Sequence, residues 1–116
     1  DLMLKDIKAD NFDAIIFVGG IGSLDYWDDR LAHVLIKDAF STGRIVAGIC
    51  SAVVTLARAG ILKDRKATVF PGDQEEIVKM GAYYTGAPVE KDANIITASG
   101  PQAAVDFGKE ILKSLK

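Results

Sequence analysis

Residues 45–60 have the sequence IVAGICSAVVTLARAG, and this stretch decides the fold. Its first five residues are apolar and rich in β-branched side chains, which predicts a short strand buried on both faces. The composition of residues 51–59 suits a helix, and Gly60 supplies a stop signal. A strand that turns directly into a helix would place Cys50, the only cysteine, above the edge of a sheet.

Cys50 has two interpretations. A helix N-terminus attracts anions, so the nucleophilic thiolate would be favoured at this position. That arrangement is a nucleophile elbow with cysteine in place of serine. The alternative is that Cys50 is a small buried hydrophobic residue, as free cysteines often are.

A second buried strand is predicted over residues 12–18, FDAIIFV, and the glycine-rich segment 19–23, GGIGS, follows it at once. The carboxyl edge of a parallel sheet is where α/β folds bind ligands, and glycine lets backbone N–H groups approach them closely. A dinucleotide site is not favoured, because the G-x-G-x-x-G pattern and the lysine of a P-loop are both absent here.

Helices and short strands alternate along the chain, which predicts an α/β fold with a mostly parallel sheet. Helices are expected over residues 25–40, 73–80 and from 101 onward, and strands over 67–70, 88–91 and 95–98. The last two strands would form a hairpin. For the first helix we expect a buried stripe of Leu31, Val34, Leu35 and Ala39. For the last helix we expect one of Ala104, Val105, Ile111, Leu112 and Leu115.

The sequence shows only two long buried strands, which make a poor centre for a doubly wound sheet. We therefore expect residues 1–116 to be a single domain that lacks a strand–helix unit at its N-terminus. A net charge of -2 argues against nucleic acid and anionic membranes as partners. A single cysteine and the lack of a leader or membrane-spanning run favour the cytoplasm. No cofactor or metal site is expected.

Several segments together resemble the DJ-1/PfpI superfamily, which has the class I glutamine amidotransferase-like fold. They are DAIIFVGG (13–20), AGIC (47–50), AGILKDRKAT (59–68), VEKD (89–92), IIT (95–97) and SGP (99–101). The resemblance implies a flavodoxin-like three-layer sandwich with a mostly parallel sheet. It also implies a homodimer or higher oligomer and an oxidisable, nucleophilic cysteine at the elbow.

By this resemblance, Cys50 is the nucleophile, and the backbone N–H groups of Gly20 and Ser51 form the oxyanion site. Asp25 is a candidate acid/base, although it would also suit a helix N-cap. The predicted substrate pocket consists of Gly19, Ile21, Gly22, Tyr26 and Phe70.

The sequence also departs from the family pattern. The protease-like branch carries histidine directly after the cysteine, where this chain has Ser51, and the DJ-1-like branch carries histidine where this chain has Phe70. The glutamate of the family's first strand–helix unit has no counterpart in residues 1–11, and Ser99 replaces an arginine before Gly-Pro. The only histidine, His33, is expected to be structural, and Trp27 is expected either to pack or to line the pocket.

Three functions remain open. The first is an enzyme that acts on reactive carbonyls, as glyoxalases and deglycases do, or that hydrolyses small amides or isonitriles. The second is a redox-responsive stress protein or chaperone that uses an oxidisable cysteine. The third is an inert interaction domain. Peptidase activity is the least supported enzymatic option. The expected partners are a small-molecule substrate, a second copy of the chain, and a separate N-terminal fragment that would complete the sheet.

Overall fold

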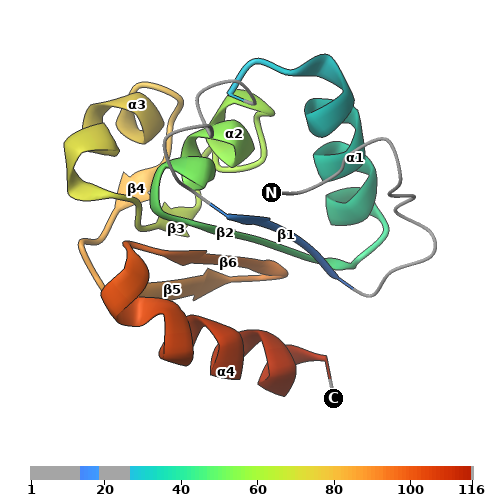
Figure 1. Ribbon diagram of the computed structural model, residues 1–116. Helices are drawn as coiled ribbons and strands as arrows, with labels where there is room; N and C mark the ends of the chain where they lie inside the picture. Colours follow the sequence, from blue (N-terminus) through green and yellow to red (C-terminus); the bar gives the residue numbers. More distant parts are fainter. Residues whose placement is uncertain (1–13, 19–26, 116) are drawn as a thin grey trace.

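A four-stranded sheet lies at the centre of the protein, whose computed structural model describes residues 14–18 and 27–115 (Figure 1). The strand order is β1 (Ala14–Val18), β2 (Ile45–Ile49), β6 (Ile95–Ala98) and β5 (Val89–Asp92). β1, β2 and β6 run parallel, whereas β5 pairs with β6 as an antiparallel hairpin. The predicted strand at 45–49, the described part of the strand at 12–18, and the hairpin are confirmed.

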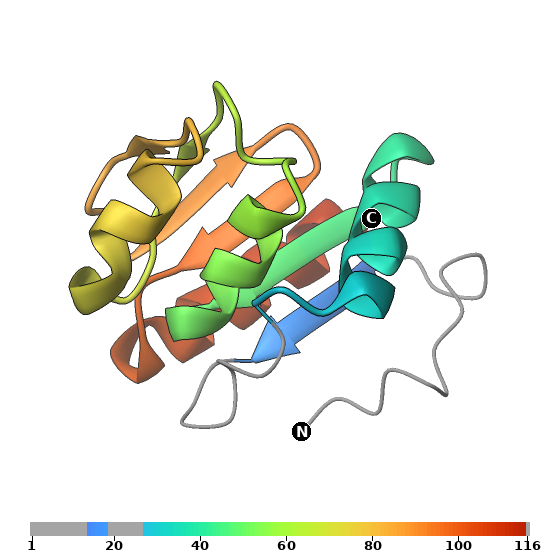
Figure 2. The same cartoon turned by 90° about the horizontal axis from the view of Figure 1, so that it is seen from above.

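Helices cover both faces of this sheet. α1 (Arg30–Ser41), α2 (Val53–Arg58) and α3 (Gln74–Val78) lie on one side, and α4 (Ala104–Ser114) lies on the other (Figure 1). α2 lies between α1 and α3 (Figure 2). Alternate strand residues enter different cores: Val46 packs with α1 and α2, whereas Ala47 packs with α4. The three-layer arrangement is therefore confirmed.

A small second sheet flanks α3. It consists of the parallel strands β3 (Lys66–Ala67) and β4 (Tyr83–Tyr84). β3 ends earlier than predicted, because Thr68 donates its N–H to the Thr97 hydroxyl instead of to a strand partner. None of the helices in the two described stretches is long and apolar enough to cross a membrane.

The structure corrects the predicted face and start of α1. Asp29, not Asp25, is the N-cap, since its carboxylate accepts the N–H of Ala32 at 3.0 Å. The buried residues of α1 are Ala32, Leu35, Ile36 and Ala39, while the predicted core residues Leu31 and Val34 are 48% and 62% exposed. Ala32, Ile36 and Ala39 recur at spacings of four and three residues and form the buried stripe, which leaves Leu31 and Val34 on the outer side of the helix.

The structure also corrects the predicted face of α4. Phe107 and Ile111 pack against the sheet, but Val105, Leu112 and Leu115 are 70%, 63% and 42% exposed. Ala104 is exposed as well. The apolar arc of α4 is wider than the part that the sheet covers, so the outer half of the arc faces outward.

Candidate functional site

Cys50 lies at a sharp turn between β2 and α2. It directly follows Ile49, begins the 3₁₀ turn Cys50–Ala52, and has a left-handed φ of +62°. For a residue other than glycine, this conformation costs about 1–2 kcal/mol. Such strain is characteristic of the nucleophile elbow, in which the nucleophile stands at the end of a strand and the start of a helix. The prediction that Cys50 lies at a strand-to-helix turn is therefore confirmed.

Small residues on both sides of Cys50 allow this turn. A Cβ at Gly48 would lie 3.1 Å from Leu56 Cδ1 and 3.4 Å from Val53 Cα, so glycine lets α2 pack directly on β2. Ala52, two residues after the cysteine, is buried. The pattern G-x-C-x-A over residues 48–52 thus has the same steric purpose as G-x-S-x-G in serine elbows.

Cys50 lines an apolar pocket of about 300 Å³. The other lining residues come from the ends of β1 and β2 and from the start of α4: Val18, Ile49, Pro101, Ala104 and Phe107. The parallel register pairs Val18 with Ile49 and Ile49 with Ala98, so the carboxyl ends of three strands meet beside the cysteine. A half-buried thiol against apolar walls can receive a small, weakly polar electrophile.

Three contacts hold the elbow from the side of α1 and α3. The N–H of Phe70 donates to the Cys50 carbonyl at 3.4 Å. Trp27 Nε1 donates to the Ser51 carbonyl at 3.0 Å, and Ser51 Oγ donates to Asp73 Oδ2 at 2.5 Å. Both the cysteine and the residue after it are therefore fixed by segments distant in sequence.

The structure places only some of the predicted site residues. Cys50 and Ser51 lie together at the elbow. Phe70 reaches the elbow through its backbone N–H, and the residue is 45% exposed. The other predicted residues lie outside the described residues: Gly19, Gly20, Ile21, Gly22, Asp25 and Tyr26. His33 Nε2 donates to the Trp27 carbonyl at 2.7 Å, a contact within the α1 region rather than at the elbow.

Sequence reasoning missed Asp73 as a residue of the elbow. Asp73 lies at the N-cap position of α3, but its side chain makes no capping bond and binds Ser51 instead. Trp27 also holds the elbow, through the hydrogen bond that its Nε1 donates to the Ser51 carbonyl. The pocket wall from Pro101, Ala104 and Phe107 was also missed. The sequence feature that could have indicated this wall is that residues 99–101 directly follow β6, a strand parallel to β2.

An ion-pair cluster lies behind Trp27. Arg58 donates to Asp28 at 2.8 and 3.0 Å and to Glu76 at 2.8 Å, and its guanidinium lies 5.5 Å from the centre of the Trp27 ring. The hydrogen bonds to Glu76 and then Asp28 raise the pKa of Arg58. The bonds from Arg58 and then Lys79 lower the pKa of Glu76. The cluster joins α2, α3 and the segment before α1.

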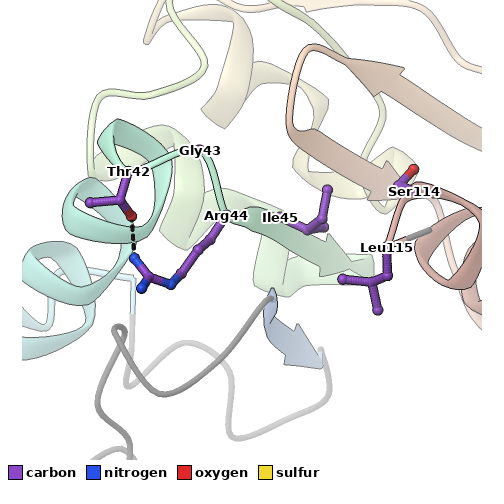
Figure 3. A pocket seen from close by; sticks show the side chains of 6 residues that line it. All are labelled: Thr42, Gly43, Arg44, Ile45, Ser114 and Leu115. Carbon is purple, nitrogen blue, oxygen red and sulfur yellow. Dashed lines mark hydrogen bonds between the residues drawn. The ribbon is translucent and has the colours of Figure 1, made fainter.

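A second pocket, of about 370 Å³, lies at the opposite end of β2 (Figure 3). Among the described residues that line it, Arg44 is the only charged one, and Arg44 Nη1 already donates to Thr42 Oγ1 at 2.5 Å. Among the residues that the structure describes, no group of three or more His, Cys, Asp or Glu side chains could hold a metal ion. We therefore place the candidate site at Cys50.

Comparison with known proteins identifies a family that matches the sequence and the fold of this chain. The profile of the DJ-1/PfpI family matches residues 1–114. Protein MJ0967 of Methanocaldococcus jannaschii is 44% identical over an alignment of 116 positions, which covers 97% of this chain and 57% of that protein. A Pyrococcus abyssi protein named deglycase is 30% identical, and the match covers all of this chain and 70% of that protein.

A solved structure shows the same architecture. The crystal structure of a ThiJ/PfpI domain protein from Brachyspira murdochii has a TM-score of 0.92 and 37% identity, and the match covers all of this chain and 69% of that one. The flavodoxin-like fold expected from the sequence is thereby confirmed. The chain spans between about half and about two thirds of the length of these relatives. From the family profile, the relatives and the shared fold, this chain belongs to the DJ-1/PfpI family.

Proposed function

We propose that this protein is an enzyme that uses Cys50 as a nucleophile toward small reactive carbonyl compounds, such as glyoxals. The observation that carries the proposal is the left-handed Cys50 at the start of a helical turn, facing an apolar pocket of about 300 Å³. A pocket of this size accepts a small molecule, and its walls exclude water from a carbonyl beside the sulfur. The relative named deglycase favours the same class of substrate.

In the proposed reaction, the Cys50 thiolate attacks the carbonyl carbon and forms a C–S bond. The C=O π electrons move to oxygen, and the resulting oxyanion is stabilised by the N–H groups of Ser51 and Gly20. A carboxyl group, for which Asp25 is our candidate, then protonates the oxyanion to give a hemithioacetal. A proton shift from the carbon that bears sulfur to the neighbouring carbonyl carbon of a glyoxal converts this adduct into a thioester. Water hydrolyses the thioester to a 2-hydroxy acid, which breaks the C–S bond and returns the Cys50 thiol. The same elbow suits small amides or isonitriles as electrophiles, which are the second substrate class within this proposal.

The test compares the wild type with Cys50→Ala and Cys50→Ser in methylglyoxal turnover. We expect both substitutions to abolish turnover, because neither side chain supplies a thiolate. The matched control is Ser99→Ala, which changes a small polar residue near the same sheet edge and keeps the thiol. Turnover that survives Cys50→Ala would refute the proposal.

A redox-responsive stress protein or chaperone is the second candidate. The observation that favours it is that Cys50 is the only cysteine of the chain and faces a pocket, so its oxidation leads to sulfenic and sulfinic acid rather than to a disulfide within the chain. Peroxide treatment followed by intact mass measurement tests this candidate. The expected product carries two added oxygen atoms, and an unmodified chain after peroxide would exclude this candidate.

Peptidase chemistry is less favoured, because the positions at Ser51 and Phe70 lack histidine.

We further propose that this chain associates with another polypeptide that completes its sheet. The partner is either a separate N-terminal strand–helix fragment or a second copy of the chain in a homodimer or higher oligomer. Among the strands of the described residues, β1 lies at one edge of the sheet, and Val18 on it is 68% exposed. Val105 and Leu112 on α4 are 70% and 63% exposed. Apolar side chains exposed near the edge of a sheet favour association. Native mass spectrometry tests this, and a lone monomer at micromolar concentration would contradict it. We propose the cytoplasm as the location, with neither nucleic acid nor a membrane as partner.

A further inference from the structure

Ser51 is held at two of its atoms by side chains from distant segments. Trp27 Nε1 donates to its carbonyl oxygen at 3.0 Å, and its own Oγ donates to Asp73 Oδ2 at 2.5 Å. A residue fixed at both its carbonyl and its side chain has little freedom left to rotate about Cα. The direction of its backbone N–H is then set as well.

Asp73 binds the Ser51 hydroxyl instead of capping the helix that follows it. It occupies the N-cap position of α3, where an aspartate normally accepts an N–H from the first turn. Its side chain makes no such bond and reaches Ser51, 22 residues earlier in the chain. Departures from a local rule tend to occur at functional sites, because another demand on the residue takes priority.

The turn that carries Asp73 also holds Cys50. The N–H of Phe70 donates to the Cys50 carbonyl at 3.4 Å, and the N–H of Asp73 donates to the Phe70 carbonyl at 2.8 Å. Residues 70–73 therefore contact both residues of the elbow, one through the backbone and one through a side chain. This double contact fixes the elbow relative to the start of α3.

Trp27 is itself firmly placed. Its carbonyl accepts the Nε2 hydrogen of His33 at 2.7 Å, and its ring lies under Arg58 with the guanidinium 5.5 Å from the ring centre. Arg58 is bound in turn by Asp28 and Glu76. A donor held at its backbone and on its ring face loses little further freedom on binding Ser51.

We propose that Asp73 and Trp27 are positioning residues that aim the Ser51 N–H at the developing oxyanion. They act through Ser51 and do not touch the substrate. This inference rests on the proposed function, in which that N–H stabilises the oxyanion. It adds two residues, neither of them a histidine, that fix the orientation of the Ser51 backbone at the elbow.

The kinetic test uses Asp73→Ala, Ser51→Ala and their double variant. Ser51→Ala keeps the backbone N–H and removes only the hydroxyl. We expect each single variant to lower kcat for methylglyoxal by about ten-fold with an almost unchanged KM, because misalignment weakens only the transition state. The double variant should match the single variants, because all three break the same bond. Asp73→Asn keeps an acceptor, so it should retain most of the activity.

The control is Glu75→Ala, which removes a neighbouring exposed carboxylate from the same helix and should behave as wild type. Trp27→Phe keeps an aromatic ring without the N–H donor and should lower kcat in the same way as Asp73→Ala. Losses that multiply in the double variant, or an equal loss in Glu75→Ala, would overturn the inference.

A second readout does not depend on turnover. The amide resonance and hydrogen exchange of Ser51, measured by NMR, should change in Asp73→Ala and in Trp27→Phe but not in Glu75→Ala. If wild type fails to turn over methylglyoxal yet the Ser51 amide responds, the proposed function fails and the positioning contact stands. An amide that is the same in wild type and in Asp73→Ala would refute the positioning role whatever the turnover.

Discussion

Replacing Gly48 by alanine tests the packing that forms the elbow. The new Cβ would lie 3.1 Å from Leu56 Cδ1, closer than the roughly 3.5–4.0 Å at which carbon atoms attract. Leu56 is fully buried and cannot turn away to solvent, and the backbone at Val53 Cα lies 3.4 Å away. Either Leu56 must leave its rotamer or α2 must shift outward by a few tenths of an ångström.

The expected cost follows from two opposing effects. Overpacking of this kind costs about 1–3 kcal/mol. Alanine in place of glycine within a strand returns about 0.5–1 kcal/mol, because the unfolded chain loses freedom. The net loss in the free energy of unfolding is therefore about 0–2.5 kcal/mol, with a central value of about 1 kcal/mol. Because α2 begins directly after the elbow, the shift should also slow the alkylation of Cys50.

Urea unfolding, followed by the fluorescence of the single tryptophan, measures this loss. With a slope of about 1–2 kcal/mol per molar urea, the midpoint should fall by roughly 1 M. The matched control is Gly108→Ala in α4, where a Cβ meets nothing within 4 Å. That variant should gain about 1 kcal/mol from helix propensity. Equal shifts of the same sign in both variants would refute the packing argument.

Three further predictions concern the rest of the fold. Gly60→Ala should lose about 1 kcal/mol in urea unfolding, because φ at this helix end is +93°; a gain would contradict the left-handed cap. Leu62→Ala should cost about 2–5 kcal/mol, since the side chain is fully buried, and a loss below 1 kcal/mol would show that the core refills. Hydrogen bonds from Arg58 and Lys79 lower the pKa of Glu76 in the folded state, so their stabilisation is present above the ordinary value of 4.5 and is lost as pH falls through the lowered one. The free energy of unfolding, measured by urea unfolding as a function of pH, should therefore fall less steeply below that pH in Glu76→Gln than in the wild type. The same acid dependence in both proteins would contradict the ion pair.

The sequence predicted the elements that follow from local pattern. β1, β2 and the β5–β6 hairpin were found because continuous apolar runs and a short polar turn leave few alternatives. Cys50 was placed at the elbow for the same reason, since a β-branched strand is followed at once by helix-forming residues. Gly60 was correctly expected to end α2.

The orientation of the helices could not be found in this way. α1 and α4 each carry apolar residues over a wider arc than the sheet covers, so their periodicity fits more than one buried stripe. The sheet selects Ala32 and Ile36 in α1 and Phe107 and Ile111 in α4, and that choice depends on the shape of the opposing surface. The contacts of Ser51 with Trp27 and Asp73 span more than 20 residues and leave no local pattern.

The central claim is that the left-handed elbow makes Cys50 a reactive nucleophile, and its alkylation by iodoacetamide tests this most directly. Intact mass spectrometry would follow the reaction at neutral pH for the native protein and for the same chain unfolded in urea, which supplies the reference thiol. The account predicts that Cys50 reacts faster in the native protein than in the unfolded chain. A native thiol that reacts more slowly, or not at all until the chain unfolds, would contradict it and leave Cys50 a packed core residue.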